Sequence, residues 1–202
     1  MEGFKVSNLI KRGQKGFTLV EIMIVLVILG LLIAVALPKV SQVLSTGKVN
    51  ATRTSMSSLA KAIKSFNADT SVWPGNISDL IVPIAAAKPC YNTKTLAAAT
   101  YTAVQVKNWK GPYMDGTTNE ISVDAWGAKV ALGVVDPTSF AFAGKDINDA
   151  AVSVTNSKDC DTFNELGAVP GLYLHSPGDD TVTSNAANAK DDIFVYVSGK
   201  VQ

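Results

Sequence analysis

The feature that most constrains this chain is an apolar run near its amino terminus. From Ile22 to Leu37 every residue is Ile, Met, Val, Leu or Ala except Gly30, and none is charged. At about 1.5 Å of rise per residue, a helix over residues 17–37 roughly matches the hydrocarbon core of a bilayer, which takes about 20 residues. A helix on a soluble protein would show a polar stripe, and this run shows none. We therefore predict a membrane-spanning helix.

The charges that flank the run predict its orientation. Residues 1–16 hold four basic residues and one acid, and such segments stay on the cytoplasmic side of the membrane. The remainder of the chain is then expected to leave the cytoplasm. A secretory signal peptide is the alternative, but it has a shorter apolar region followed by a cleavage site of small residues. Here the run continues to Pro38 and into an amphipathic segment.

A single acid, Glu21, lies near the start of the run, four residues after Phe17. Ionisable groups inside a membrane usually pair with another group. The sequence therefore predicts a partner for this carboxylate. The alternative is that Glu21 lies at the level of the lipid headgroups and extends its carboxylate toward water.

The stretch "KGFTLVEIMIVLVILGLLIAVALP" resembles the amino-terminal segment of the type IV pilin superfamily, which includes type IV pilins and the pseudopilins of type II secretion. The resemblance implies that a prepilin peptidase cleaves between Gly16 and Phe17 and methylates the new amino terminus of Phe17. It also implies that Glu21 pairs with the freed amino terminus of a neighbouring subunit in a filament. Gly30 and Pro38 match the glycine and proline that soften the family's helix.

The rest of the chain is expected to be a helical stalk followed by one globular domain. Residues 39–68 place apolar side chains near helical spacing, which predicts an amphipathic continuation of the membrane helix. After residue 125, short β-prone pieces alternate with Gly, Pro and Asp, and residues 193–198 alternate with the period of a strand. The predicted fold is α+β, with a long amino-terminal helical spine packed on a carboxy-terminal antiparallel sheet. The predicted divisions are a leader at 1–16, the membrane and assembly helix at 17–38, the amphipathic helix at 39–68 and an exported globular region at 69–202.

Cys90 and Cys160 are the two cysteines of the chain. An exported domain lies where disulfides persist, so we predict one intramolecular disulfide between them. Two free, buried thiols are the alternative, because sequence separation alone does not establish the geometry that a disulfide needs.

Two further stretches resemble the major pseudopilin of type II secretion, "WKGPYMDGTTNEISVDAWGAKVAL" and "LHSPGDDTVTSNAANAKDDI". The second is similar to the calcium-binding loop of that family, which implies carboxylate ligands at Asp180, Asp191 and Asp192 and a carbonyl ligand at Leu174. Asp179 is an extra or substitute ligand. Calcium takes about six to eight oxygen ligands, which suits this loop. The stretch between Asp180 and Asp191 is longer than in the family, and a solvated acidic turn is the alternative.

The resemblance implies a structural subunit that assembles into a type II secretion pseudopilus for protein export. Its implied partners are further copies of itself, a prepilin peptidase, an assembly ATPase with an inner-membrane platform, and minor pilins or pseudopilins. The chain would be anchored in the bacterial inner membrane and would then enter a periplasmic or extracellular filament. Residues 146–167 look like an insertion relative to the compact pseudopilin, so a major type IV pilus subunit for adhesion, motility or DNA uptake stays open. A minor binding subunit is a further alternative.

Composition and motifs argue against other classes of protein. Without residues 1–16 the formal charge is −2, so no nucleic-acid partner is predicted. The sequence contains neither a Gly-x-x-x-x-Gly-Lys loop for ATP nor a His-Glu-x-x-His metal motif. The one histidine, His175, adjoins Ser176, and neighbouring strand residues point to opposite faces, so they do not readily form a base and nucleophile. We do not expect an enzyme.

Overall fold

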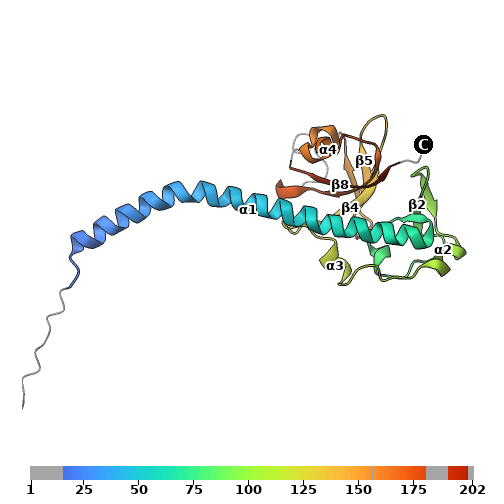
Figure 1. Ribbon diagram of the computed structural model, residues 1–202, viewed down its shortest axis with the longest axis horizontal. Coiled ribbons are helices and arrows are strands. Elements are labelled where there is room, and N and C mark those ends of the chain that lie inside the picture. Colours follow the sequence, from blue (N-terminus) through green and yellow to red (C-terminus); the bar gives the residue numbers. More distant parts are fainter. Residues whose placement is uncertain (1–15, 156, 181–190, 200–202) are drawn as a thin grey trace, which may run out of the picture. The chain divides into compact units, whose positions relative to one another are not determined.

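The computed structural model describes residues 16–155, 157–180 and 191–199. The chain falls into two compact units, Met1–Val43 and Leu44–Gln202, and a single helix, α1 (Leu19–Thr70), has residues in both (Figure 1). The predicted leader lies outside the described residues apart from Gly16. The predicted division between residues 38 and 39 falls inside α1, because helical structure continues through Pro38.

The first unit consists of the amino-terminal part of α1 and the short segment before it. Every side chain described between residues 16 and 43 is exposed, although most of them are apolar. Among the described residues, α1 is the one helix that is long and apolar enough to cross a membrane. This agrees with the predicted membrane helix.

In the second unit, which we call the globular unit, α1 is amphipathic as predicted. Met56, Leu59, Ile63 and Phe66 are each at most 1% exposed, and their spacing of three and four residues places them on one face of the helix. The helix ends at Thr70 because Ser71 takes a left-handed conformation with φ of 61°.

A five-stranded antiparallel sheet packs on this face of α1, which confirms the α+β fold. Its strand order is β6-β5-β4-β7-β8. The sequence predicted every strand of this sheet except β6. A register shift in the pairing of β7 with β8 aligns Leu172 with Ser198 and Tyr173 with Tyr196, which leaves Val197 as an extra residue and interrupts the predicted alternation. The strands are β4 (Ala131–Val135), β5 (Phe142–Lys145), β6 (Ala151–Val154), β7 (Gly171–Ser176) and β8 (Ile193–Gly199).

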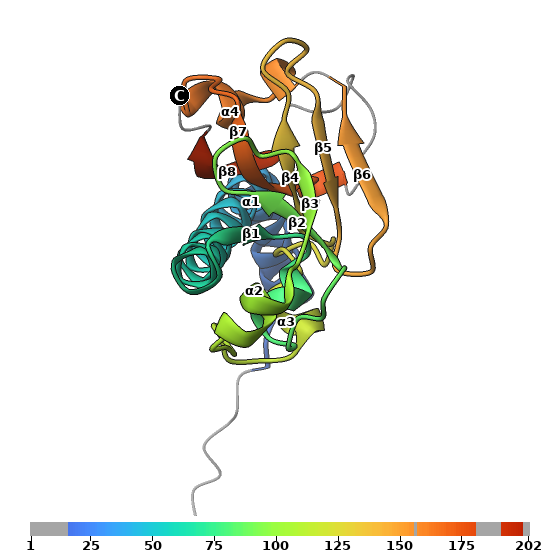
Figure 2. The same ribbon diagram turned by 90° about the vertical axis from the view of Figure 1, so that its right-hand side faces the viewer.

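Both faces of this sheet are covered. All six residues of β7, which lies between β4 and β8, are buried. Leu172 and Leu174 join the core formed with α1, whereas Tyr173 joins a second core with Phe163 and Phe194. This second core lies under the segment 155–168, which contains the short helices η2 (Ser157–Asp159) and α4 (Asp161–Glu165) (Figure 2). The described part of the predicted insertion (146–167) therefore supplies the edge strand β6 and, through η2 and α4, covers the second face of the sheet.

The segment between α1 and β4 forms a small second sheet. Its strand order is β1-β2-β3, and the pairs are antiparallel. The same segment contains the short helices η1, α2 and α3, and a further short helix, η3, follows β7. The elements are β1 (Val72–Pro74), η1 (Ile77–Leu80), β2 (Pro89–Asn92), β3 (Ala98–Thr100), α2 (Ala103–Asn108), α3 (Thr118–Ile121) and, after β7, η3 (Gly178–Asp180).

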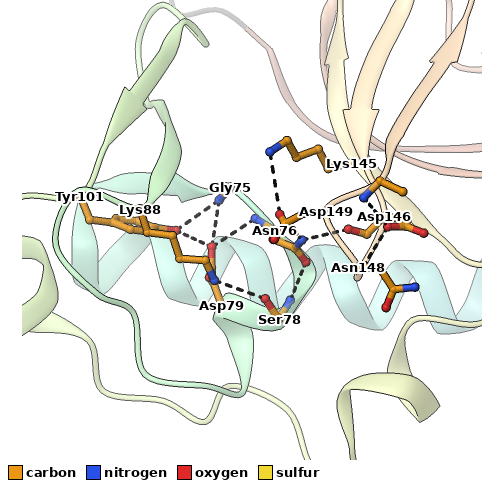
Figure 3. A network of polar contacts seen from close by, with 11 residues as sticks. Gly75, Asn76, Ser78, Asp79, Lys88, Tyr101, Lys145, Asp146, Asn148 and Asp149 are labelled. Atoms are coloured by element: carbon orange, nitrogen blue, oxygen red, sulfur yellow. Dashed lines mark hydrogen bonds and ion pairs between the residues drawn. The ribbon is translucent and has the colours of Figure 1, made fainter.

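A buried carboxylate, Asp79, connects the parts of this segment (Figure 3). Its Oδ2 accepts hydrogen bonds from the backbone N–H groups of Gly75 and Asn76, both at 3.1 Å, and from the Tyr101 hydroxyl at 2.8 Å. Its Oδ1 lies 2.6 Å from the Lys88 ammonium. Burial, together with the charge of Asp79, raises the pKa of Tyr101 far above its ordinary range, so this hydroxyl stays a hydrogen-bond donor.

Asn76 extends the same network to the five-stranded sheet. Its side-chain amide donates to the Asp146 carbonyl and to Asp149 Oδ1, both at 2.9 Å (Figure 3). Asp146 and Asp149 lie in the turn between β5 and β6. The small sheet and the large sheet are thereby fixed to each other within the globular unit.

Candidate assembly interface and metal loop

The predicted processing site lies outside the helix. Gly16 and Phe17 precede the first residue of α1, Leu19, and have no regular structure. Phe17 is 80% exposed, and nothing lies within 4 Å of the position of a Cβ on Gly16. A peptidase can therefore reach the bond between Gly16 and Phe17 without first unwinding α1.

Thr18 caps the amino terminus of α1. Its Oγ1 accepts a hydrogen bond from the Glu21 N–H at 3.2 Å, and its carbonyl accepts from the N–H groups of Glu21 and Ile22. The sequence analysis did not assign this role, although Thr-x-x-Glu before an apolar run is a readable start signal for a helix. The carboxylate of Glu21 also suits the positive end of the helix dipole. The cap lies after the cleavage site, so it would remain in a processed chain.

Glu21 is an exposed carboxylate on an exposed apolar helix. The described part of the chain provides it with no ion pair. The residues that follow include Leu26 at 61% and Leu31 at 66% exposure. A continuous apolar surface of this kind indicates contact with lipid or with other proteins. Gly30, which the resemblance marked as an assembly residue, has nothing within 4 Å of a Cβ position, and the helix continues through Pro38.

The structure does not contain the predicted disulfide between Cys90 and Cys160, because both thiols are free and buried. Cys90 lies in β2 and packs into the core on the α1 side of the large sheet. Cys160 lies in the core on the opposite face, where its Sγ donates to the Asp192 carbonyl at 2.8 Å and lies 3.1 Å from Thr162 Oγ1. The large sheet separates the two sulfur atoms, and sequence separation could not reveal this.

The structure brings together the two ends of the predicted calcium loop. Gly178 has φ of +72°, and a Cβ at this position would lie 2.3 Å from the Asp191 carbonyl oxygen, so only glycine allows this close approach. Asp180 ends η3, and its side chain is not among the described atoms. The loop at 181–190 also lies outside the described residues.

The remaining predicted ligands differ in how well they fit. Asp192 is 2% exposed, and its Oδ2 lies 2.9 Å from His175 Nε2. Such a hydrogen bond to a carboxylate is typical of the groups that orient metal ligands. Leu174 pairs with Leu132 of β4 and Val195 of β8, and the carbonyl ligand expected there stays a prediction. Within the described residues, no group of three or more His, Cys, Asp or Glu side chains is arranged to hold a metal.

His175 and Ser176 bind different partners. His175 contacts Asp192, as described above, whereas the Ser176 hydroxyl donates to Asp124 Oδ2 at 2.7 Å. Both residues are fully buried. This agrees with the prediction from strand geometry that the two side chains do not form a base and nucleophile.

Comparison with known proteins gives one matching family model and two relatives. Residues 11–37 match the family model of the prokaryotic N-terminal methylation motif. The chain is 32% identical over 117 residues to the type II secretion system core protein G of Pseudomonas aeruginosa, a match that covers 58% of this chain and 71% of that protein. It is 34% identical over 68 residues to the fimbrial protein EcpC of Eikenella corrodens, covering 34% of this chain and 44% of that protein. No solved structure gives a significant match.

The methylation motif begins before α1 and continues into its exposed part, and the match to core protein G is longer than the whole of α1. Both findings agree with the family resemblance of the amino-terminal stretch. The chain therefore belongs to the family of type II secretion core protein G, the pseudopilins, which are pilin-like filament subunits of the type IV pilin superfamily.

Proposed function

We propose that the chain is made as a prepilin of the bacterial inner membrane, with residues 1–16 in the cytoplasm and the globular unit exported. The basic character of residues 1–16 supports this orientation. The helix that follows is long enough to span a bilayer, and none of its apolar window is buried against the rest of the protein.

A prepilin peptidase then cleaves between Gly16 and Phe17 and methylates the amino terminus of Phe17. The methylation motif covers both residues, and the bond between them is exposed and outside α1. Because Thr18 caps the helix, removal of the leader leaves the start of α1 intact. The reaction also creates a new positive group, since an α-amine with an ordinary pKa of about 8 is mostly protonated at neutral pH.

The processed subunits assemble into a type II secretion pseudopilus that serves protein export. The observation that carries this proposal is Glu21, an exposed carboxylate without an ion pair in the described chain, near the start of an apolar helix. A lone carboxylate among apolar surfaces is costly, and a positive partner offsets this cost. The amino terminus of Phe17 on a neighbouring subunit supplies that partner, so the pair fixes the axial position of each new subunit. Gly30 and Pro38 soften the helix for this packing.

The proposed pseudopilus function also implies partner proteins for filament assembly. An assembly ATPase acts through an inner-membrane platform, and minor pseudopilins complete the filament. The sequence itself contains no phosphate-binding loop, so energy for assembly comes from a separate protein.

A type IV pilus is the second candidate function. The similarity to a fimbrial protein favours it, and so does the segment 155–168, which adds a second core to the globular unit. In this role the same processing and the same helix packing would build an extracellular fibre.

We further propose that the acidic loop binds calcium through Asp180, Asp191 and Asp192, with Asp179 as an additional ligand. The close approach of Gly178 to Asp191 supports this, as does the hydrogen bond between Asp192 and His175. The ion would neutralise carboxylates that otherwise repel one another. Thermal unfolding of the mature protein measures this directly: calcium should raise the unfolding temperature of the native protein and not that of the Asp191→Asn variant. Equal unfolding temperatures of the native protein in calcium and in chelator would contradict the site.

One experiment tests the processing and distinguishes the two filaments. Membrane and extracellular fractions are purified, the mature amino terminus is analysed by mass spectrometry, and filaments are imaged in calcium and in chelator. Methylated Phe17 without long surface fibres, together with calcium-dependent folding, supports the pseudopilus. Methylated Phe17 on long surface fibres that ignore chelator supports the pilus, and an uncleaved chain contradicts both.

A further inference from the structure

A groove of about 390 Å³ lies between α4, β8 and the globular part of α1. Leu166 and Tyr196 line it and are 41% and 37% exposed, although both are large apolar side chains. At its edge, Arg53 and Glu165 form an ion pair of 2.9 Å. An apolar floor with an aromatic residue, beside a charged rim with arginine, is typical of a surface that binds another protein.

A second apolar feature, Val104, lies on α2. Its side chain is 68% exposed, and α2 buries none of its six residues. The helix is nevertheless held firmly, because Thr102 and Gln105 form a capping box at its start. At its end, Trp109 Nε1 donates to the Asp79 carbonyl at 2.9 Å. Val104 is therefore a fixed, projecting apolar side chain without cover within the described residues.

The groove and the projection lie on different sides of the globular unit. Figure 1 and Figure 2 show α2 well separated from α4, in two views at right angles. A projection and a complementary groove at separate places on one surface make a heterologous contact. Such contacts give a ring where the rotation between copies closes, and an open helical filament where it does not. A groove that bound its own counterpart would give a closed dimer instead.

The charges beside the two features are complementary. Lys107 is exposed on α2, three residues from Val104, and the described residues provide no ion pair for it. Glu165 keeps 61% of its side chain exposed despite its pairing with Arg53. An approach that places Val104 in the groove can bring Lys107 toward Glu165, and such rim charges fix the register of an interface.

From these features we infer that α2 of one subunit docks into the groove between α4 and β8 of the next copy of the chain, with Val104 against Leu166 and Tyr196. This inference rests on the proposed filament function. It assigns to the globular units a contact of their own, in addition to the packing of the amino-terminal helices.

Cysteine cross-linking of the full-length protein, expressed with its assembly machinery, tests the contact. The double variant Val104→Cys with Leu166→Cys should give a ladder of covalent multimers after oxidation, because each subunit joins one neighbour through each cysteine. Each single variant should stay monomeric. The control pair Lys94→Cys with Leu166→Cys moves the first cysteine to the exposed turn between β2 and β3 and should also stay monomeric. Cys90 and Cys160 are only 2% and 0% exposed, so they do not contribute.

A second variant tests the contact without cross-linking. Val104→Asp should remove most filaments and leave the thermal unfolding of the subunit unchanged, whereas Val104→Ile should preserve filament yield. Filaments of the double-cysteine variant without a ladder would overturn the inferred contact, as would covalent dimers from either single variant. Absence of filaments from the unmodified subunit would instead overturn the proposed filament function.

Discussion

The two parts of α1, before and after residue 43, differ in which of their side chains are buried, although the helix is continuous. Between Ile22 and Leu37 its side chains are apolar on every side of the helix, and all of them are exposed. Between Leu44 and Thr70 the apolar side chains gather on one face, where residues such as Met56 and Ile63 are fully buried. The hydrophobic pattern, and not the backbone, therefore decides whether a stretch of helix meets lipid and other subunits or the core of its own domain.

This difference separates stability from assembly. In the globular unit, the second part of α1 packs on the large sheet, and the apolar core between them stabilises the fold. Every described side chain of the first part is exposed. Substitutions in the two parts should therefore differ in what they damage, and the following variants probe that separation from the largest expected effect to the smallest.

Phe66→Ala should be the most damaging change to folding. Phe66 is fully buried, and its ring packs against Tyr101 and Tyr113 with centroids 6.1 and 5.6 Å away. Removal of such a ring costs about 3–5 kcal/mol of unfolding free energy. Denaturant unfolding of the detergent-solubilised mature protein measures the loss. The matched change Leu29→Ala, in the exposed part of α1, should alter this free energy by less than about 0.5 kcal/mol; equal losses for the two variants would refute the separation.

Asp79→Ala should destabilise the globular unit by about 2–4 kcal/mol, because it leaves buried donors without their acceptor. The affected groups include the Tyr101 hydroxyl and the Asn76 N–H. The same unfolding measurement applies, with Asp115→Ala, at an exposed acid, as the control. A loss at Asp79 no larger than the loss at Asp115 would show that the network does not hold the small sheet.

The Cys90 thiol should be nearly unreactive in the folded protein. Burial, and then the nearby charge of Asp79, raises its pKa from 9.0 to about 11. Because the thiolate is the reactive form, its population at pH 8 is about a hundredfold lower than at the ordinary pKa. Alkylation followed by mass spectrometry should label neither cysteine in the native protein and both in denaturant without reductant. No label in denaturant would reveal the disulfide that the structure lacks.

Arg53→Ala should have the smallest effect. Arg53 and Glu165 are 2.9 Å apart, but their side chains are 42% and 61% exposed, and exposed pairs contribute about 0–1 kcal/mol. A double-mutant cycle with Glu165→Ala measures the coupling, which should weaken further as salt is added. A coupling above about 2 kcal/mol would show that this rim is part of the fold itself.

Much of the fold was predictable because long, regular patterns carry their own signal. The apolar run before Pro38 and the stripe ending at Phe66 predicted both parts of α1. The strands β4, β5, β7 and β8 were also expected, since β-prone residues stand there between turn residues. The strands β1, β2, β3 and β6 are only three or four residues long. Such short strands are stabilised by contacts with residues far away in the sequence, such as the hydrogen bonds around Asp79. No local sequence pattern predicts them.

The candidate functional residues also divide into those that the sequence predicts and those that it does not. Gly16, Phe17 and Glu21 are readable from sequence because they form a contiguous motif. The arrangement at the acidic loop is not, because it joins residues that are far apart in the chain, such as His175 and Asp192. The expected disulfide failed for the same reason: nothing in the spacing of Cys90 and Cys160 shows that a sheet lies between them.

Glu21→Ala offers the most direct test of whether the exposed part of α1 is reserved for assembly. In one set of samples, mass spectrometry follows the amino terminus at Phe17, calorimetry follows unfolding, and imaging follows filament yield. We predict normal cleavage and methylation, an unchanged unfolding temperature and loss of filaments, because the carboxylate that meets the neighbouring amino terminus is gone. A normal yield of filaments from this variant would contradict the assigned role of Glu21.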